Sequence, residues 1–161
     1  MISITALLHT ENDGLRLGRA LETLYACDDI LIVDHGSRDA TTRVARQYGA
    51  TVVNAEPGCA SPDYLRFARA GWILSLHPCE SLTEKLSASL FEWKSGMPGS
   101  RAEASTFSVF LREETAQGWI ENPAAQTRLV PQGWKLWKGK YPIHEQSARA
   151  LEGELLRFVF P

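Results

Sequence analysis

The sequence predicts an α/β protein whose sheet is mostly parallel and covered by helices. Residues 30–33, Ile-Leu-Ile-Val, form an unbroken apolar run, which is typical of a strand buried on both faces of a parallel sheet. Apolar residues then recur at helical spacing over 41–48, and Gly49 follows where the C-terminus of a helix favours glycine. Strand and helix patterns alternate in this way along residues 2–90, as they do in doubly wound sheets.

Four strands and four helices are predicted in this part of the chain. The strands are short, apolar and rich in β-branched residues, and they cover 2–8, 30–33, 51–53 and 72–76. The helices follow them, over 17–24, 41–48, 64–68 and from Ser81 onward. For the last helix, Ser81 and Glu84 have the spacing of a capping box, so we expect Ser81 to be its N-cap.

After residue 93 the pattern changes. A stretch rich in glycine and proline, 94–100, precedes short strand-like segments at 106–112, 119–120, 127–130 and 155–160. We therefore expect one domain over 1–161, with an α/β half at 1–93 and a β-rich half at 94–161. The second half is too short for an independent core, so we expect it to extend the first.

Composition excludes several classes of protein. The chain has 161 residues, a formal net charge of −2, 44% hydrophobic and 22% charged residues, all ordinary for a globular protein. There is no basic excess for nucleic acid, and no apolar run long enough for a membrane span. Its three cysteines are odd in number and form no C-x-x-C pair, and no secretory signal is apparent, so we expect a cytoplasmic protein.

Polar clusters follow each of the four predicted strands, at 9–13, 34–39, 54–56 and 77–80. Because ligands of open parallel sheets bind outside the carboxyl ends of the strands, these clusters predict a pocket there. Asp34 follows the fully apolar strand and precedes a glycine, so its carboxylate can accept hydrogen bonds from a ribose hydroxyl or a base N–H. It can equally cap its own turn. Asp39 is expected to order the loop around Asp34.

One ordered motif identifies a relative. The sequence reads Asp34-His-Gly-Ser-Arg-Asp-Ala-Thr41 and then Tyr48-Gly-Ala50. This resembles the Asp-x-Gly-Ser-x-Asp-x-Thr pattern and the following helix end of family 2 glycosyltransferases, especially the lipopolysaccharide-core type. The resemblance covers residues 1–85, and it recurs at Gln126-Thr-Arg-Leu129 and His144-Glu145.

The resemblance implies a GT-A fold and a nucleotide-diphosphosugar donor. It makes 1–93 the Rossmann-like, nucleotide-binding half and 94–161 the half on the acceptor side. It implies that Asp34 contacts the base or ribose of the donor and that Asn12 matches an asparagine of the first loop. It also implies transfer of the sugar to a sugar or lipid-linked acceptor, in surface polysaccharide or lipopolysaccharide synthesis. The family uses Mn²⁺ or Mg²⁺, held by an Asp-x-Asp motif after the fourth strand.

The chain departs from the family at that motif. The matching residues are His77, Pro78, Cys79 and Glu80, so both aspartates are absent. One alternative is metal-independent transfer, in which Arg66, Arg69 or Arg128 stabilises the leaving group. A second is a different metal held by a set with softer ligands, namely His77, Cys79, Glu80 and His144. A third is loss of catalysis, which leaves a protein that only binds a nucleotide-sugar or a partner protein.

If the chain is active, a carboxylate is needed to take the proton of the acceptor hydroxyl as that oxygen attacks the anomeric carbon. Glu145 is the expected general base, because it stands in the His-Glu pair that resembles a late motif of the family. Glu121 is the alternative.

Overall fold

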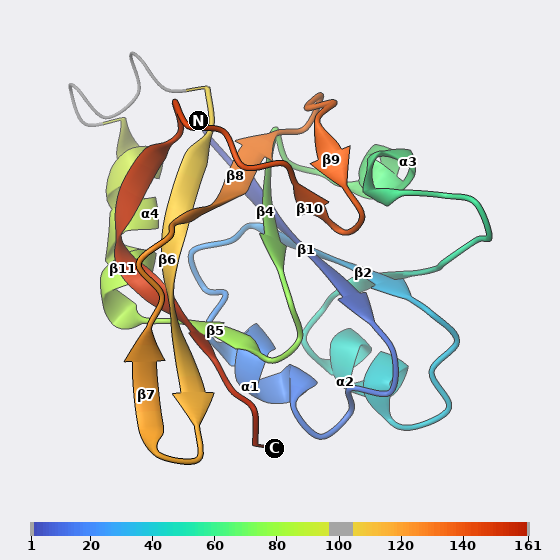
Figure 1. Ribbon diagram of the computed structural model, residues 1–161. Helices are drawn as coiled ribbons and strands as arrows, with labels where there is room; N and C mark the ends of the chain where they lie inside the picture. Colours follow the sequence, from blue (N-terminus) through green and yellow to red (C-terminus); the bar gives the residue numbers. More distant parts are fainter. Residues whose placement is uncertain (1, 97–104, 161) are drawn as a thin grey trace.

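A computed structural model describes residues 2–96 and 105–160, and in these it is the α/β fold that the sequence predicts (Figure 1). The predicted boundary stretch 94–100 lies partly outside the described residues. The strands are β1 (Ile4–Thr10), β2 (Asp29–Asp34), β3 (Thr51–Asn54), β4 (Trp72–Leu76), β5 (Glu80–Leu82), β6 (Phe107–Thr115), β7 (Gly118–Glu121), β8 (Gln126–Pro131), β9 (Trp137–Lys138), β10 (Tyr141–Pro142) and β11 (Arg149–Arg157). The helices are α1 (Leu17–Glu22), α2 (Thr41–Gln47), α3 (Ser61–Tyr64), the 3₁₀ turn η1 (Leu65–Phe67) and α4 (Glu84–Ser95).

One sheet runs through both predicted halves of the chain, in the order β3-β2-β1-β4-β8-β6-β11-β5, with β7 paired to β6. The strands β3, β2, β1 and β4 are mutually parallel. From β8 onward the sheet is mixed, because β8 is antiparallel to β4 and to β6, while β11 is parallel to β6. The later strands therefore extend the first four, and the small hairpin β9–β10 lies outside this sheet.

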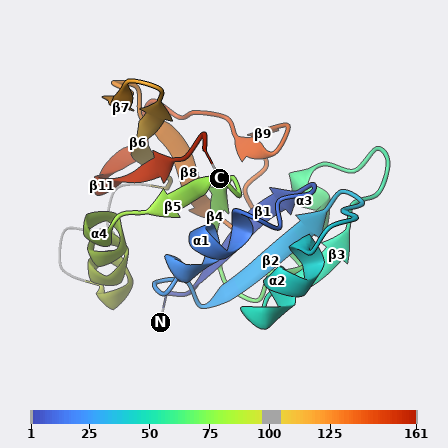
Figure 2. The same cartoon turned by 90° about the horizontal axis from the view of Figure 1, so that it is seen from below.

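The sheet separates two apolar cores. The larger core joins α1, α2 and α4 to one face, through side chains such as Leu21, Leu86 and Trp93 packed on Ile32 and Leu74. On the other face, Tyr64 and Leu65 of α3 and η1 pack against β2 and β4, and Trp134 and Trp137 add to this core. Figure 2 shows the resulting layers, with α3 and β9 on the opposite side of the sheet from α2. Helices thus cover both faces of the parallel strands, as their apolar sequences require.

One predicted helix start is wrong. Ser81 is not the cap of α4, because Glu80–Leu82 forms the short strand β5, which pairs with β11. The N-cap is Thr83, whose hydroxyl accepts a hydrogen bond from the Leu86 amide at 3.2 Å. The pairing with β11 is made by residues more than seventy positions later, so a local capping signal could not predict it.

Within residues 2–96 and 105–160, no helix is long and apolar enough to cross a membrane.

Candidate functional site

The loops after β1 and β2 are locked together at the carboxyl edge of the parallel strands. Asn12 has a φ of 54°, and its side-chain Oδ1 accepts a hydrogen bond from the Arg38 amide at 2.8 Å. Its own amide donates to the Ser37 hydroxyl at 2.9 Å. Asp39 accepts from the amides of Gly14 and Thr41, both at 2.9 Å. The predicted side chains Asn12 and Asp39 therefore meet at one edge and hold its shape.

Asp34 is buried at the end of β2 and has most of its acceptor capacity in use. Its Oδ1 accepts from the hydroxyls of Thr10 at 2.8 Å and Ser37 at 2.6 Å, and its Oδ2 accepts from the Ser37 amide at 2.9 Å. Since a carboxylate has about four acceptor positions, one on Oδ2 remains for a ligand. The side chain is 3% exposed, so its main work in this structure is to order the turn.

Hydrogen bonds explain the electrostatic state of Asp39. The hydroxyl and the amide of Thr41, followed by other backbone amides, lower the pKa of this exposed carboxyl, because they bind its charged form. Asp39 accordingly stays ionised just before Ala40, the N-cap residue of α2. A negative charge at that helix N-terminus does not favour binding a phosphate directly there.

A chain of hydrogen bonds through His9 crosses the same edge. His9 Nδ1 lies 2.9 Å from His35 Nε2, and His9 Nε2 lies 2.9 Å from the Ser61 hydroxyl, which donates to the Lys140 carbonyl at 3.3 Å. Burial, with smaller effects from His35 and Lys140, lowers the pKa of His9 to about 4. Neutral His9 has one ring proton. With Ser61 donating to the carbonyl, that proton sits on Nε2, and Nδ1 accepts from His35.

Beside β4, the last acid of the degenerate motif is paired with an arginine. Glu80 is fully buried, and its Oε1 and Oε2 accept from the two Nη atoms of Arg128 at 2.7 and 2.9 Å. Its Oε1 also accepts from the His77 amide at 2.7 Å. Burial raises the pKa of Glu80, but Arg128 outweighs this and holds the pKa below its usual value. Glu80 is thus an ionised partner inside the protein.

Arg128, predicted as a ligand-binding side chain, is engaged by groups of the protein itself in this structure. Besides the two bonds to Glu80, it donates from Nη1 to the Ser75 carbonyl, and from Nε and Nη2 to Gln126 Oε1. These bonds account for all five N–H donors of a guanidinium. The Tyr141 ring covers Arg128, with its centroid 4.5 Å from the guanidinium carbon. Arg128 therefore has no donor left for a leaving diphosphate.

The predicted metal ligands are not assembled. Throughout 2–96 and 105–160, no three His, Cys, Asp or Glu side chains are grouped so that they could hold a metal ion. Both oxygens of Glu80 serve Arg128, and His77 Nδ1 accepts the amide proton of Cys79 at 3.2 Å. Burial lowers the pKa of His77 and raises the pKa of the Cys79 thiol. The residues present at this turn do not fit a divalent cation.

Glu145, the expected base, is placed near the end of β4 by Thr127. β8 is antiparallel to β4, with Leu74 opposite Leu129, so Thr127 lies toward the carboxyl end of β4. The Thr127 hydroxyl accepts from the Glu145 amide at 2.9 Å and lies 3.1 Å from His144 Nδ1. His144 and Glu145 therefore reach the predicted edge from the second half of the chain. The alternative base, Glu121, lies on β7 and lines a different cavity.

Two cavities open at this edge. One, of about 430 Å³ at the end of β3, is lined by the exposed Arg66 together with Asn54, Glu56 and Tyr64. The other, of about 250 Å³, is bordered by Asn12 and Asp39. Arg66 is the predicted cation that does reach an open cavity, and its guanidinium lies over the Phe67 ring at 4.8 Å. We call this region, formed by the loops after β1 to β4 and by Glu145, the crevice.

Sequence reasoning missed two features of the crevice. Arg128 was separated from Glu80 by 48 positions, and the one available signal was a charged residue inside an apolar strand pattern. The contact of His9 with His35 and Ser61 had no sequence signal beyond the position of His9 at the end of a strand. Both features depend on which strands become neighbours.

Comparison with known proteins confirms the resemblance to glycosyltransferases. No family model matches the chain. An uncharacterized glycosyltransferase of Rickettsia felis is 31% identical over 91 residues, which are 53% of this chain and 32% of the relative. The 4,4'-diaponeurosporenoate glycosyltransferase of Staphylococcus aureus is 38% identical over 55 residues, 32% of this chain and 15% of that enzyme. The chain thus spans a third or less of the curated relatives it matches.

Solved structures confirm the fold class. The crystal structure of TarS from S. aureus covers 98% of this chain, at TM-score 0.59 and 12% identity, and the match takes up 37% of TarS. The sequence-based expectation of a GT-A nucleotide-sugar transferase fold is therefore correct. Glucosyl-3-phosphoglycerate synthase from Mycobacterium tuberculosis matches 70% of this chain and 43% of its own, at TM-score 0.46 and 16% identity. That structure was solved with Mn²⁺ and UDP. Those ligands are features of that protein.

Proposed function

We propose that this chain is the donor-binding domain of a glycosyltransferase, which binds a nucleotide-diphosphosugar in the crevice and transfers its sugar to a hydroxyl acceptor. The observation that carries the proposal is that residues from separate parts of the chain meet at one edge of the sheet. The loops after β1 and β2 are fixed to each other, Arg66 lines the open cavity beside them, and Glu145 arrives from the far half of the chain. The carboxyl ends of parallel strands are where such sheets bind ligands.

Within this proposal the residues have separate tasks. Asp34 offers one acceptor position, on Oδ2, to a ribose hydroxyl or base N–H of the donor. Arg66 provides charge for the diphosphate, since Arg128 is fully engaged with Glu80, Ser75 and Gln126. Glu145 takes the proton of the acceptor hydroxyl. No step needs a metal ion at His77–Glu80, because that turn lacks the ligands for one. The acceptor class, a glycan or lipid-linked sugar of surface polysaccharide synthesis, is an extension of the resemblance.

Calorimetric titration with UDP, GDP and CDP, and with their sugar conjugates, tests donor binding. We expect one nucleotide to bind with and without EDTA, and Arg66→Ala to weaken it by about tenfold, because a charge-assisted contact to the diphosphate is lost. Arg46→Ala is the matched control, since Arg46 is an exposed arginine in the last turn of α2. Absence of binding by any nucleotide to a folded sample would refute the proposal.

Donor hydrolysis, measured as release of nucleoside diphosphate, tests transfer separately from binding. Glu145→Gln should reduce this release by about 10²-fold or more while leaving the binding isotherm unchanged, because a general base acts only on the reaction.

A second candidate function, donor binding without transfer, is favoured by the closed Glu80–Arg128 pair at the position of the metal motif. Nucleotide binding with no release from any conjugate would establish that second function.

A further inference from the structure

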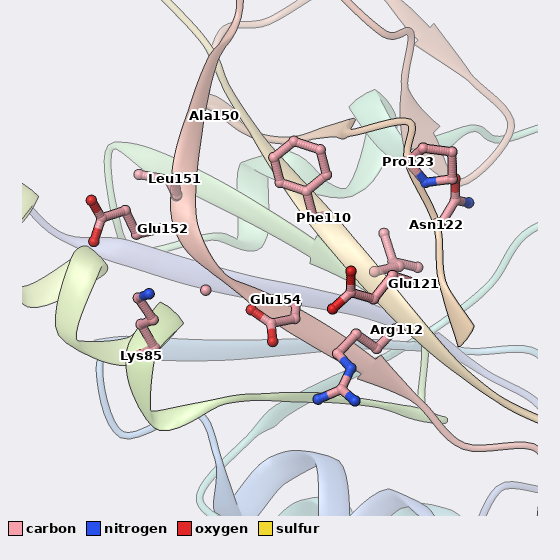
Figure 3. Close-up of a pocket in the computed structure, with 12 residues that line it drawn as sticks. Lys85, Phe110, Arg112, Glu121, Asn122, Pro123, Ala150, Leu151, Glu152 and Glu154 are labelled. Carbon is pink, nitrogen blue, oxygen red and sulfur yellow. The ribbon is translucent and has the colours of Figure 1, made fainter. Parts of the chain in front are cut away.

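A cavity of about 750 Å³ lies away from the crevice, on the outer face of β6, β7 and β11 (Figure 3). It is larger than the 430 Å³ cavity at the end of β3. Its size is within the range of about 300–1,000 Å³ that is usual for small-molecule sites. The residues that matter for its chemistry are Lys85, Phe110, Arg112, Glu121, Glu152 and Glu154.

The alternation of strand β6 directs two of these side chains outward. Val109 and Leu111 are buried in the larger core, so their neighbours Phe110 and Arg112 project from the opposite face. The register places Glu121 of β7 directly opposite Arg112. It also places Glu154 of β11 beside Phe110. Figure 3 shows the two carboxylates gathered around Phe110 and Arg112.

An irregularity in β11 completes the cavity wall. The register between β11 and β6 shifts between Ala150 and Glu154, and Gly153 within the shift has a φ of +94°. A Cβ at Gly153 would lie 2.2 Å from the Leu86 amide nitrogen, so the strand touches the first turn of α4. This close approach brings Lys85 of α4 to the rim. The wall is therefore set by backbone geometry that only glycine permits.

The two basic side chains of the cavity have no acidic partner among the residues that the structure describes. In the part of the chain that the structure describes, neither Arg112 nor Lys85 forms an ion pair, although Arg112 stands opposite Glu121. The Nε of Arg112 is buried and has no hydrogen-bond partner there. Such an orphaned donor costs free energy unless something fills its place. The Phe110 ring beside it is 39% exposed.

We propose that this cavity binds an uncharged carbohydrate. Three glutamates face one lysine and one arginine, so the lining has a net charge of −1, which disfavours a nucleotide, a phosphate or another anion. The lining holds donors, on Lys85 and Arg112, and acceptors, on the glutamates, and these match a ring whose hydroxyls each donate and accept. The exposed face of Phe110 provides the apolar surface on which the C–H face of such a ring packs. This site does not depend on nucleotide binding in the crevice.

Saturation-transfer NMR and calorimetry with the methyl glycosides of glucose, galactose, mannose and N-acetylglucosamine, and with maltotriose, test this proposal. We expect at least one to bind, and Phe110→Ala to weaken it by about tenfold or more. Phe91→Ala is the matched control, because Phe91 is 46% exposed on α4. Glu121→Gln keeps the side-chain shape, so it separates loss of an acceptor from loss of folding, and it should weaken the same glycan.

Two results would overturn the proposal. One is that no glycan of the panel binds at millimolar concentration to a protein that is folded. The other is that a glycan binds equally well to the Phe110→Ala and Glu121→Gln variants, which would place it elsewhere. Arg66→Ala distinguishes this cavity from the crevice. It should weaken nucleotide binding and leave glycan binding unchanged, whereas loss of glycan binding in Arg66→Ala would assign the glycan to the crevice.

Discussion

Two buried polar networks flank β4, and they solve the same problem in different ways. The Glu80–Arg128 pair keeps both charges and cancels them with a bidentate contact and further hydrogen bonds. The chain from His35 through His9 to Ser61 is built around a neutral His9, and we call it the neutral network. The first joins β8 to the start of β5. The second ties β1, the loop after β2 and the start of α3 to the turn of the β9–β10 hairpin. The comparison teaches that the charged network loses stability when one partner is removed, whereas the neutral network loses stability when the pH falls.

The largest effect is expected from breaking the charged network. Glu80→Gln leaves Arg128 with an uncompensated charge in a buried site, and we expect it to lower the free energy of unfolding by about 3–5 kcal/mol. Urea denaturation at pH 7 measures this. Glu92→Gln on the exposed face of α4 is the control and should change stability by less than about 0.5 kcal/mol. An equally small effect of Glu80→Gln would contradict the role assigned to the pair.

The neutral network predicts a loss of stability as pH falls. The unfolded state binds a proton at His9 near pH 6.5, whereas the folded state does so only at about 4. Stability that is fully present above pH 6.5 is therefore lost on acidification through that window, by about 2 kcal/mol between pH 7 and 5. Glu80 does not contribute here, because its pKa lies below 4.5 and its stabilisation is lost only at lower pH.

Denaturation of His9→Gln at pH 7 and at pH 5 checks this slope. The difference in stability between pH 7 and pH 5 should be much smaller in the variant than in the wild type. The part that remains should have the same sign and come from His77, whose pKa is also lowered. If wild type and variant have the same pH dependence, His9 is not the titrating group.

A smaller effect is expected at the end of the neutral chain. Ser61→Ala removes the acceptor of His9 Nε2–H and leaves that buried donor without a partner, at a cost of about 1–3 kcal/mol. Ser75→Ala is a matched control, because Ser75 is equally buried but its hydroxyl has no hydrogen-bond partner in the described part of the chain. The melting temperature of Ser61→Ala should lie well below that of Ser75→Ala. Equal melting temperatures would show that the neutral network contributes little to stability.

The sequence predicts the parallel half of the fold because its signals are local. The run at 30–33, the glycine at 49 and the motif from Asp34 to Thr41 all lie within the elements they define, and the interlocked loops after β1 and β2 follow from them. The capping signal at Ser81 fails because β5 pairs with a distant strand. Arg128 is not recognised as a buried ion-pair partner for the same reason. Its partner Glu80 becomes a neighbour only after β8 joins β4, and no periodicity in either segment encodes that event.

The sheet order also sets a sequence of events during synthesis. β1 to β4 can pair among themselves from residues 4–76 alone, but the outer edge of β4 stays open until β8 is made. Until then Glu80 has no arginine, and the cap of α4 lacks the bonds that join Thr83 to Glu154. A nascent chain of this protein therefore passes through a stage in which β4 has one open edge and Glu80 is an uncompensated acid. This is the stage at which chaperones and aggregation compete for the chain.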